Sequence, residues 1–443
     1  MSDPSSAADA SARFIRDSIP AGGLFQGATW RISPEPFRLG ESLAKEFESL
    51  GRVLLQFYRA VNLLYRRSVE GSAPAWVAEV LDRGKPPELI ALQRDPALKN
   101  EIPRVIRPDV LLSDEGFAIS ELDSVPGGIG LTHWLNQTYA ASPSQSWPVI
   151  GGAMGMRDGF VSIFGKAKRV HLVVSEESAS YRPEMIWLAQ QIQDGEFSVR
   201  NTDFTEFAPG DAVYRFFELF DLAQVPNSGR IFELARAKQV RVTPPPKPIF
   251  EEKLLFALLW NRNLREFWRQ ELGEGFYLRL LKHVPRTWVI DPTPLPPNAA
   301  YPGLELTDWR QLKGLSQRER ELILKVSGYS PVAWGARGVY LGSDLNTSDW
   351  SVAVEQALAG WSQSPYVLQR FHRPRIVDST WYDFASNTLQ SMPGRVRLCP
   401  YYFVSGDGEA ARAKLGGVLA TIVPADKKIV HGMNDGILVP CVV

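Results

Sequence analysis

The chain has 443 residues, a formal net charge of zero, 44% apolar residues and 22% charged residues. Zero net charge argues against a dedicated binder of nucleic acid or of anionic membranes, because such proteins normally carry a basic excess. The length exceeds that of one ordinary core and predicts two or three domains. With only two cysteines, Cys399 and Cys441, and no apolar run as long as a membrane span, we expect a cytoplasmic protein without disulfides or membrane contacts.

The chain begins with small polar residues, which predict a disordered tail over residues 1–20. The stretch from Gly40 to Val69 then predicts one long amphipathic helix, because apolar side chains recur at three- and four-residue steps. Those side chains are Leu43, Phe47, Leu50, Leu54, Phe57, Val61 and Leu64. We expect residues 21–165, which hold this helix and the hairpin described next, to form one part of a larger core.

Two apolar runs between residues 104 and 123 flank the sequence Asp114-Glu115-Gly116, which predicts a β-hairpin with a three-residue loop and Gly116 in the left-handed conformation. In that register Glu121 faces Asp109 and Asp123 faces Arg107. Because side chains alternate between the two faces of a strand, these four charged groups lie on one face at one end of the hairpin.

Two interpretations of this acidic hairpin are open. Three converging carboxylates are ligands that Mg²⁺ prefers, and the glycines of SVPGGIG just beyond them would let a backbone approach a ligand closely. An ordinary ion-pair network with a plain turn after it explains the same residues, and surface ion pairs contribute little to stability. From this stretch alone we favour the ion-pair network.

Residues 166–247 alternate strand-like and helix-like runs, which predicts a small parallel α/β lobe of the Rossmann type. The segment PPPKP after it is typical of a stiff linker. Four charged residues of this lobe are candidates for shaping a substrate site, although a structural role is the simpler interpretation. They are Glu176, Glu177, Arg182 and Arg215.

In residues 248–443, two lysines stand in apolar surroundings. Lys253 opens the helical run KLLFALLW, and Lys325 is the only charge in the strand-like run ELILKV. A buried lysine needs a partner, so Lys325 either binds an anionic ligand or extends to solvent from an edge strand. Gln369 follows the strand-like run YVL and precedes Phe371. A hinge that holds a flat base would have this pattern, and so would any strand end.

The order of these motifs resembles that of the circularly permuted ATP-grasp proteins, and most nearly the synthetase domain of glutathionylspermidine synthase. That family carries R-x-D, then E-x-N twelve residues after the Asp, as in Arg107-Pro108-Asp109 and Glu121-Leu122-Asp123. The resemblance implies that Asp109, Glu121 and Asp123 hold Mg²⁺ and that Arg107 faces the transferred phosphoryl group. It also implies an α/β (α+β) fold with the small parallel lobe inserted.

The resemblance extends to the expected ATP site. The family's first ATP lysine opens a K-x-x-x-x-L-L-W helix, as Lys253 does, and its second lies in a V-K-P strand, as Lys325 does. A glycine/arginine loop then follows in the family, and here the sequence reads GARG. The resemblance assigns to ATP the residues Lys253, Lys325, Gly338, Leu368, Gln369 and Phe371, with Arg337 as a second catalytic arginine.

Three departures from the family pattern matter. The family's Asn is Asp123 here, the insertion SGYSPVAW lengthens the loop before Arg337, and the family's arginine beyond a Gly-Gly strand has no evident counterpart after Gly416-Gly417. Thr421 stands near that position, and Lys427 or Lys428 is a possible substitute.

The resemblance implies an ATP- and Mg²⁺-dependent ligase that joins a small-molecule or peptide carboxylate to an amine through an acyl phosphate. Residues 248–443 would then form the nucleotide-binding lid and the C-terminal sheet of the core. A non-catalytic nucleotide-binding scaffold, suggested by the missing arginine, and a small-molecule kinase are the alternatives.

Overall fold

The computed structural model describes residues 4–24, 29–333, 337–430 and 435–443. The chain forms two compact units, neither of which is continuous in sequence. Unit 1 comprises Met1–Tyr58, Asp95–Pro246 and Pro374–Val443, and unit 2 comprises Arg59–Arg94 and Lys247–Arg373. The chain therefore passes from one unit to the other four times.

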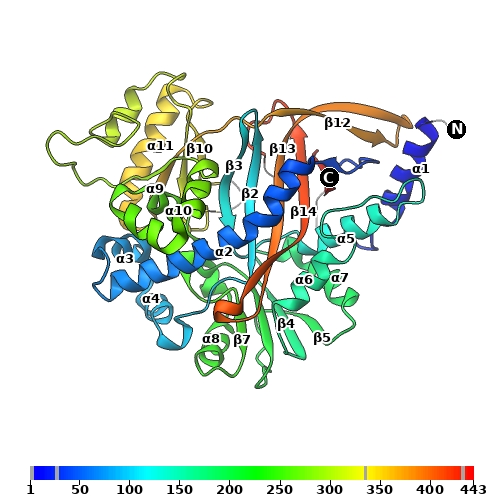
Figure 1. The fold of residues 1–443 in the computed structure, drawn as a ribbon, viewed down its shortest axis with the longest axis horizontal. Helices are drawn as coiled ribbons and strands as arrows, with labels where there is room; N and C mark the ends of the chain where they lie inside the picture. Colours follow the sequence, from blue (N-terminus) through cyan, green and yellow to red (C-terminus); the bar gives the residue numbers. More distant parts are fainter. Residues whose placement is uncertain (1–3, 25–28, 334–336, 431–434) are drawn as a thin grey trace. The chain divides into compact units, whose positions relative to one another are not determined.

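Unit 1 is built on a seven-stranded sheet with the order β1-β15-β14-β13-β2-β3, to which β12 is added by pairing with β13 (Figure 1). The strands are β1 (Phe37–Arg38), β2 (Val105–Ser113), β3 (Gly116–Asp123), β12 (Ile376–Asp383), β13 (Thr388–Ser405), β14 (Arg412–Pro424) and β15 (Ile437–Val442). Strand β13 is central because it pairs with β2, β12 and β14. Its segment CPYYFV is buried throughout, which confirms the core position that its aromatic sequence predicts.

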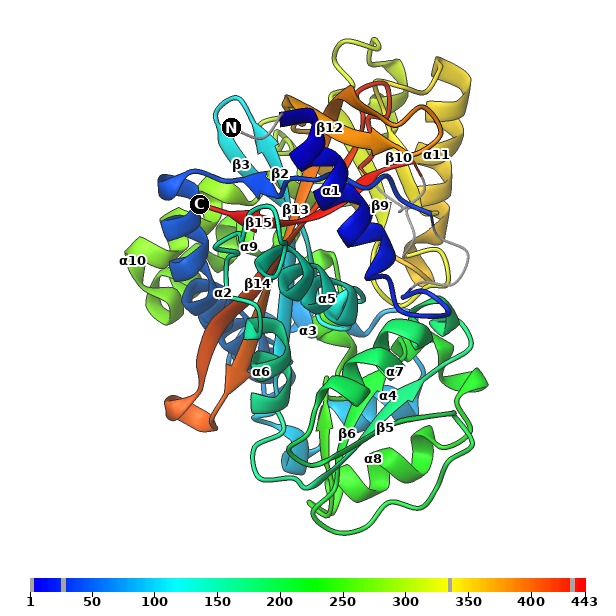
Figure 2. The same ribbon diagram turned by 90° about the vertical axis from the view of Figure 1, so that its right-hand side faces the viewer.

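Helices cover both faces of this sheet (Figure 2). Helices α5 (Ile129–Ala140) and α6 (Gly155–Ser162) pack against β13, β14 and β15 on one face. On the other face, the Tyr402 hydroxyl donates to the Phe47 carbonyl of α2 (Glu41–Val69) at 2.7 Å. A Cβ atom on Gly51 would lie 2.5 Å from the Tyr402 ring, so the helix approaches the sheet closely there.

Helix α2 confirms the long helix predicted from periodicity. Six of the seven predicted core side chains are at most 1% exposed, and Leu43, near the start of the helix, is half-buried. The disordered tail expected at residues 1–20 is replaced, within the described residues, by α1 (Pro4–Asp17). Buried Ala12 and Ile15 give that helix an apolar contact face, which its polar composition did not suggest.

The β2–β3 hairpin differs from its predicted form by one residue. The pairs Asp109↔Glu121 and Arg107↔Asp123 occur as predicted, but Gly116 already pairs with Ser113, so the loop has two residues rather than three. A β-bulge at Ser120 takes up the difference, and the Ser120 hydroxyl donates to the Asp109 carbonyl at 3.1 Å. The bulge inserts one unpaired residue and so restores the predicted register at the charged end.

The small parallel sheet predicted for residues 166–247 is present in unit 1, with the order β5-β4-β6-β7. All three strand pairs are parallel. The strands are β4 (Arg169–Val174), β5 (Glu196–Arg200), β6 (Ala212–Phe216) and β7 (Arg241–Thr243), and the helices are α7 (Arg182–Gln191) and α8 (Ser228–Arg236). The PPPKP segment after β7 is buried, and the boundary between units 1 and 2 falls within it, as expected of a linker.

Unit 2 contains a four-stranded antiparallel sheet with the order β10-β9-β11-β8. The strands are β8 (Thr287–Val289), β9 (Leu322–Val326), β10 (Val339–Leu341) and β11 (Tyr366–Arg370), and the helices are α3 (Ala75–Asp82), α4 (Pro87–Gln93), α9 (Leu254–Trp260), α10 (Arg265–His283) and α11 (Thr347–Ala359). One face packs on α11 through a core that includes Trp350, Leu324 and Leu368. Helix α9 contacts β8 and β11 but takes no part in that core, so it covers the opposite face.

No helix in the described ranges is both long and apolar enough to cross a membrane. The two cysteines are free and buried.

Candidate functional site

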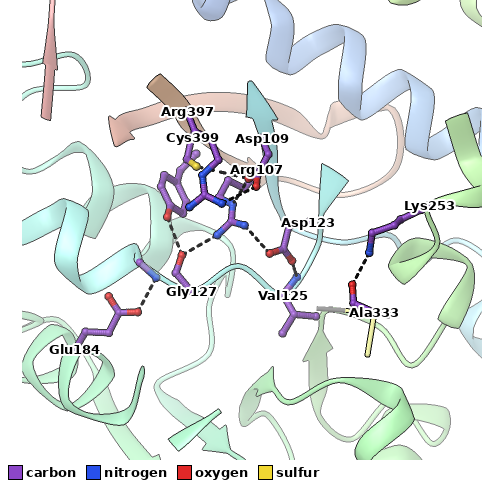
Figure 3. Close-up of polar contacts among 12 residues, drawn as sticks. Arg107, Asp109, Asp123, Val125, Gly127, Glu184, Lys253, Ala333, Arg397 and Cys399 are labelled. Carbon is purple, nitrogen blue, oxygen red and sulfur yellow. Dashed lines mark hydrogen bonds and ion pairs between the residues drawn. The ribbon is translucent and has the colours of Figure 1, made fainter. Parts of the chain in front are cut away.

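The four charged residues of the hairpin form an ion-paired cluster in unit 1. Figure 3 shows the Arg107 guanidinium between the carboxylates of Asp109 and Asp123. Its Nε lies 3.2 Å from Asp109 Oδ1, and its Nη2 lies 2.9 Å from Asp123 Oδ2. Its Nη1 donates to the Gly127 carbonyl at 3.1 Å. Every nitrogen of this guanidinium therefore has an acceptor from the protein.

Strand β13 adds two groups to the cluster. Because β13 lies beside β2, Arg397 is aligned with Leu111 and reaches Asp109, with Nη1 3.1 Å from Oδ2. The Cys399 thiol donates to Asp109 Oδ1 at 3.5 Å. The cluster is largely covered, since the side chains of Arg107, Asp109 and Arg397 are 15%, 12% and 18% exposed.

Burial and charge act against each other in this cluster. Burial alone would lower the pKa of Arg107, but Asp109 and Asp123 outweigh it and hold that pKa well above its ordinary value. Burial raises the pKa of Asp123, although Arg107 and the backbone N–H of Val125 oppose the rise. Burial, reinforced by Asp109, raises the pKa of the Cys399 thiol to about 12, so the thiol stays protonated and is not a nucleophile.

The glycines after the hairpin lie in close contact with side chains from other parts of the protein. The Gly127 carbonyl accepts hydrogen bonds from Arg107 and, at 2.7 Å, from the Tyr401 hydroxyl. A Cβ atom on Gly127 would lie 2.1 Å from the Tyr181 ring, and Gly128 adopts φ +87° next to the Tyr401 hydroxyl. Packing against aromatic side chains thus explains why this turn carries glycine.

A buried acid that the sequence analysis did not select fixes the same turn. Glu184 of α7 is fully buried and accepts hydrogen bonds from the backbone N–H groups of Gly128 and Leu131, each at 2.7 Å. These groups begin α5, so the carboxyl group caps that helix and holds the turn that carries the Gly127 carbonyl. Burial raises the pKa of Glu184 to about 7, against the lowering effect of those N–H groups.

Glu184 gives a testable pH dependence. Below about pH 4.5 the carboxyl group is protonated in both the folded and the unfolded chain; between 4.5 and 7 only the unfolded chain ionises, which destabilises the fold as pH rises. We expect the wild type to lose roughly 3 kcal/mol of stability relative to Glu184→Gln across this window and no more above it. Urea unfolding at a series of pH values measures the difference.

Glu176→Gln is the matched control, because the Glu176 side chain is 85% exposed and we expect its removal to leave the pH profile unchanged. A stability difference between wild type and Glu184→Gln that does not vary with pH would contradict the raised pKa.

The carboxylates that the resemblance assigns to Mg²⁺ have protein donors as partners here, and their role in holding a metal ion stays a prediction. Their oxygens are the donor type that Mg²⁺ prefers, but both oxygens of Asp109 and both oxygens of Asp123 already accept from protein donors. Across the described parts of the chain, no three acidic, histidine or cysteine side chains gather closely enough to hold a metal ion. Glu121 lies opposite Asp109 and is half-buried.

In unit 2, two residues of the predicted ATP site lie in direct contact. Lys325 is 6% exposed on β9, and its ammonium group donates to Gln369 Oε1 on β11 at 2.9 Å. Gln369 Nε2 donates to Thr287 Oγ1 on β8 at 3.0 Å. The three polar side chains form a line across adjacent strands. Because β9 is an interior strand, the alternative that Lys325 extends from an edge strand is wrong.

Lys253 is held where α9 begins. Its ammonium group donates to the Ala333 carbonyl at 2.7 Å (Figure 3). The preceding Glu252 is buried, forms an ion pair with Lys85 at 2.5 Å and accepts from the backbone N–H of Gly328 at 3.0 Å. Glu252 thereby ties the start of α9 to the loop that follows β9.

The other residues assigned to ATP occupy different environments. Leu368 is fully buried in the core of unit 2, and Phe371 is half-buried just after β11. Gly338 leaves no room for a larger residue, because a Cβ atom at this position would lie 2.4 Å from the Val326 side chain. Arg337 is exposed, and the preceding Gly335 and Ala336 of the predicted loop lie outside the described residues, as does His431 at the end of the resemblance.

The charged residues of the small parallel sheet are mainly structural. Arg215 is fully buried, and its Nε donates to the Pro244 carbonyl at 3.2 Å. Arg182 donates to the Val174 carbonyl at 2.8 Å, and Glu176 is exposed 4.0 Å from Arg182. This agrees with the simpler interpretation of these residues.

Thr421, which stands near the position expected for a further arginine, is buried directly opposite Arg397 on β13. Lys427 and Lys428 are exposed. A cation is thus present at the cluster, but it comes from the neighbouring strand. Sequence reasoning missed Arg397 because the run RVRLC alternates charged and apolar residues as any half-exposed strand does.

The fold is similar to that of a glutathione synthetase-like protein, and the likeness concerns the fold alone. A glutathione synthetase-like effector from Globodera pallida, solved without ligand, matches 100% of this chain and 98% of its own, with a TM-score of 0.57 and 13% identity. A protein provisionally described as a gamma-glutamylcysteine synthetase from Methylobacillus flagellatus matches 84% of this chain and 85% of its own, with 12% identity; its TM-score of 0.36 is too low to support an argument. No family model and no curated protein matches the sequence.

Proposed function

We propose that this protein is an ATP-dependent ligase that joins a carboxylate to an amine through an acyl phosphate. The observation that carries the proposal is the contact between Lys325 and Gln369. The sequence resemblance assigns both residues to ATP, they are 44 positions apart, and the fold brings them together on one face of the unit 2 sheet. The similarity in fold to a glutathione synthetase-like protein adds support by analogy only, because a fold does not by itself determine a reaction.

In the proposed reaction, a carboxylate oxygen of the acid attacks the γ-phosphorus of ATP, the bond to the β-phosphate oxygen breaks, and ADP leaves. The amine nitrogen then attacks the carbonyl carbon, inorganic phosphate leaves, and the amine gives up a proton. Unit 2 contributes Lys253 and Lys325, whose charges and hydrogen bonds favour bound phosphates.

The test is ADP release from ATP in the presence of pooled amino acids and polyamines, with Mg²⁺ added and omitted in parallel. We expect at least one pool to raise the rate of ADP release above the rate with ATP alone. ATP binding without any stimulated release would contradict the ligase.

A non-catalytic nucleotide-binding protein is the second candidate, and one observation favours it. The carboxylate oxygens of Asp109 and Asp123 all accept from protein donors. The acids that the resemblance assigns to Mg²⁺ are therefore already neutralised by Arg107 and Arg397. This candidate predicts ATP binding in unit 2 with no release of ADP under any pool.

A further inference from the structure

The two arginines of the unit 1 cluster differ in how many of their donors are in use. Arg107 uses all three nitrogens, on Asp109, Asp123 and the Gly127 carbonyl. These contacts engage three of the five N–H groups of the guanidinium, and its two carboxylate partners compete with any ligand for it. Its geometry is that of a clamp between two acids.

Arg397 has fewer of its N–H groups engaged than Arg107 has. Within residues 4–24, 29–333, 337–430 and 435–443, its one side-chain hydrogen bond runs from Nη1 to Asp109 at 3.1 Å. Its Nε is buried and has no acceptor there. A buried donor left without an acceptor is destabilising, so this side chain retains hydrogen-bonding capacity that the described residues do not satisfy.

The position of Arg397 is fixed by the sheet. Its backbone pairs with Thr421 on β14 and Leu111 on β2, so it lies in an interior strand. Asp109 orients the guanidinium and, together with Cys399, outweighs the effect of burial to raise its pKa, so the group is always charged. The side chain is 18% exposed, which leaves part of it open to a ligand.

We propose that Arg397 binds an oxyanion, either a phosphoryl group or a carboxylate, whereas Arg107 is a positioning residue that holds Asp109 and Asp123. A planar guanidinium with free donors is well suited to the paired oxygens of either group. This inference deepens the proposed function, on which the identity of the oxyanion rests, and it moves the anion-binding role from Arg107 to a residue that the family resemblance does not select.

The test compares Arg397→Lys with wild type. Lysine keeps the positive charge and can keep the ion pair with Asp109, but it removes the planar guanidinium and its spare donors. Affinities for inorganic phosphate and for acetate are measured from the shift of the unfolding midpoint with anion concentration at constant ionic strength. We expect at least tenfold weaker binding of one or both anions to Arg397→Lys. The anion affected identifies the ligand as phosphoryl or carboxylate.

Two variants control the comparison. Arg375→Lys makes the same substitution at an exposed side chain of unit 1, and we expect its anion affinities to stay within twofold of wild type. Arg107→Lys is expected to lower the unfolding midpoint more than Arg397→Lys does, while anion affinity changes less. Arg397→Gln serves as a second variant if the lysine variant is unstable.

The inference is overturned if wild type responds to neither anion, or if Arg397→Lys and Arg397→Gln bind both anions as wild type does. Its failure is separable from failure of the ligase, because ATP binding and ADP release are measured on the same variants. Stimulated ADP release with an unchanged anion response in Arg397→Lys removes the inference alone. An Arg397-dependent anion response without ATP binding keeps it and removes the ligase.

Discussion

Replacing Arg107 with methionine is expected to lower the free energy of unfolding by about 3 kcal/mol or more. The change leaves Asp109 and Asp123 side by side without the guanidinium that joins them, and breaking a buried ion pair typically costs roughly 3–5 kcal/mol. We take the low end because the Asp123 side chain is 28% exposed and solvent can reach it. Urea unfolding of wild type and variant at neutral pH gives the difference.

The matched control for Arg107→Met is Arg157→Met, which breaks a surface ion pair with Asp158 in α6. We expect that variant to lose no more than about 1 kcal/mol. Adding Asp123→Asn to Arg107→Met should recover part of the loss, because it removes the carboxylate that has lost its ion pair, whereas Asp109 keeps its ion pair with Arg397. A loss below about 1 kcal/mol for Arg107→Met would mean that the cluster is an exposed ion-pair network of little energetic weight.

Replacing Lys325 with methionine is expected to weaken ATP binding at least tenfold, or about 1.4 kcal/mol. A hydrogen bond to a charged group contributes roughly 1.5–3 kcal/mol, and methionine keeps most of the side-chain volume in this buried position. Calorimetric titration of wild type and variant with ATP measures the change, and the unfolding midpoint shows whether the variant is folded.

Lys313→Met is the control for this second prediction. Lys313 lies in the same unit, and its ion pair with Glu355 is on the surface, so the variant removes the same charge away from the line of Lys325, Gln369 and Thr287. We expect its ATP affinity to equal that of wild type. If Lys325→Met binds ATP as tightly as wild type does, Lys325 is a structural lysine.

The parts of the fold that follow local periodicity were predictable. Helix α2, the parallel sheet and the charged end of the β2–β3 hairpin follow from apolar spacing and side-chain alternation. The loop of that hairpin was predicted one residue too long because nothing in the sequence signals the bulge at Ser120. Helix α11 was not predicted, although Asn346 caps it by accepting from the backbone N–H of Asp349.

The candidate site was predictable only where one strand pair creates it. Arg107 and Asp123 are 16 positions apart in adjacent strands, so register alone brings them together. Arg397 reaches the cluster from β13, and Glu184 of α7 holds the turn beside it; pairing between distant segments cannot be read from one sequence. Glu184 in particular looks like an ordinary acid in the first turn of a helix. The two-arginine cluster therefore became visible only in the folded chain.

The central claim is that an acid is activated as an acyl phosphate, and hydroxylamine trapping tests it most directly. Wild type is incubated with ATP, Mg²⁺ and pooled carboxylic acids, with hydroxylamine in place of the amine, and the products are analysed by mass spectrometry. The account predicts an ATP-dependent hydroxamate that Lys325→Met forms at a reduced rate. A stable phosphorylated product that hydroxylamine does not consume would identify a kinase instead, and ATP binding with no product of either kind would contradict the ligase.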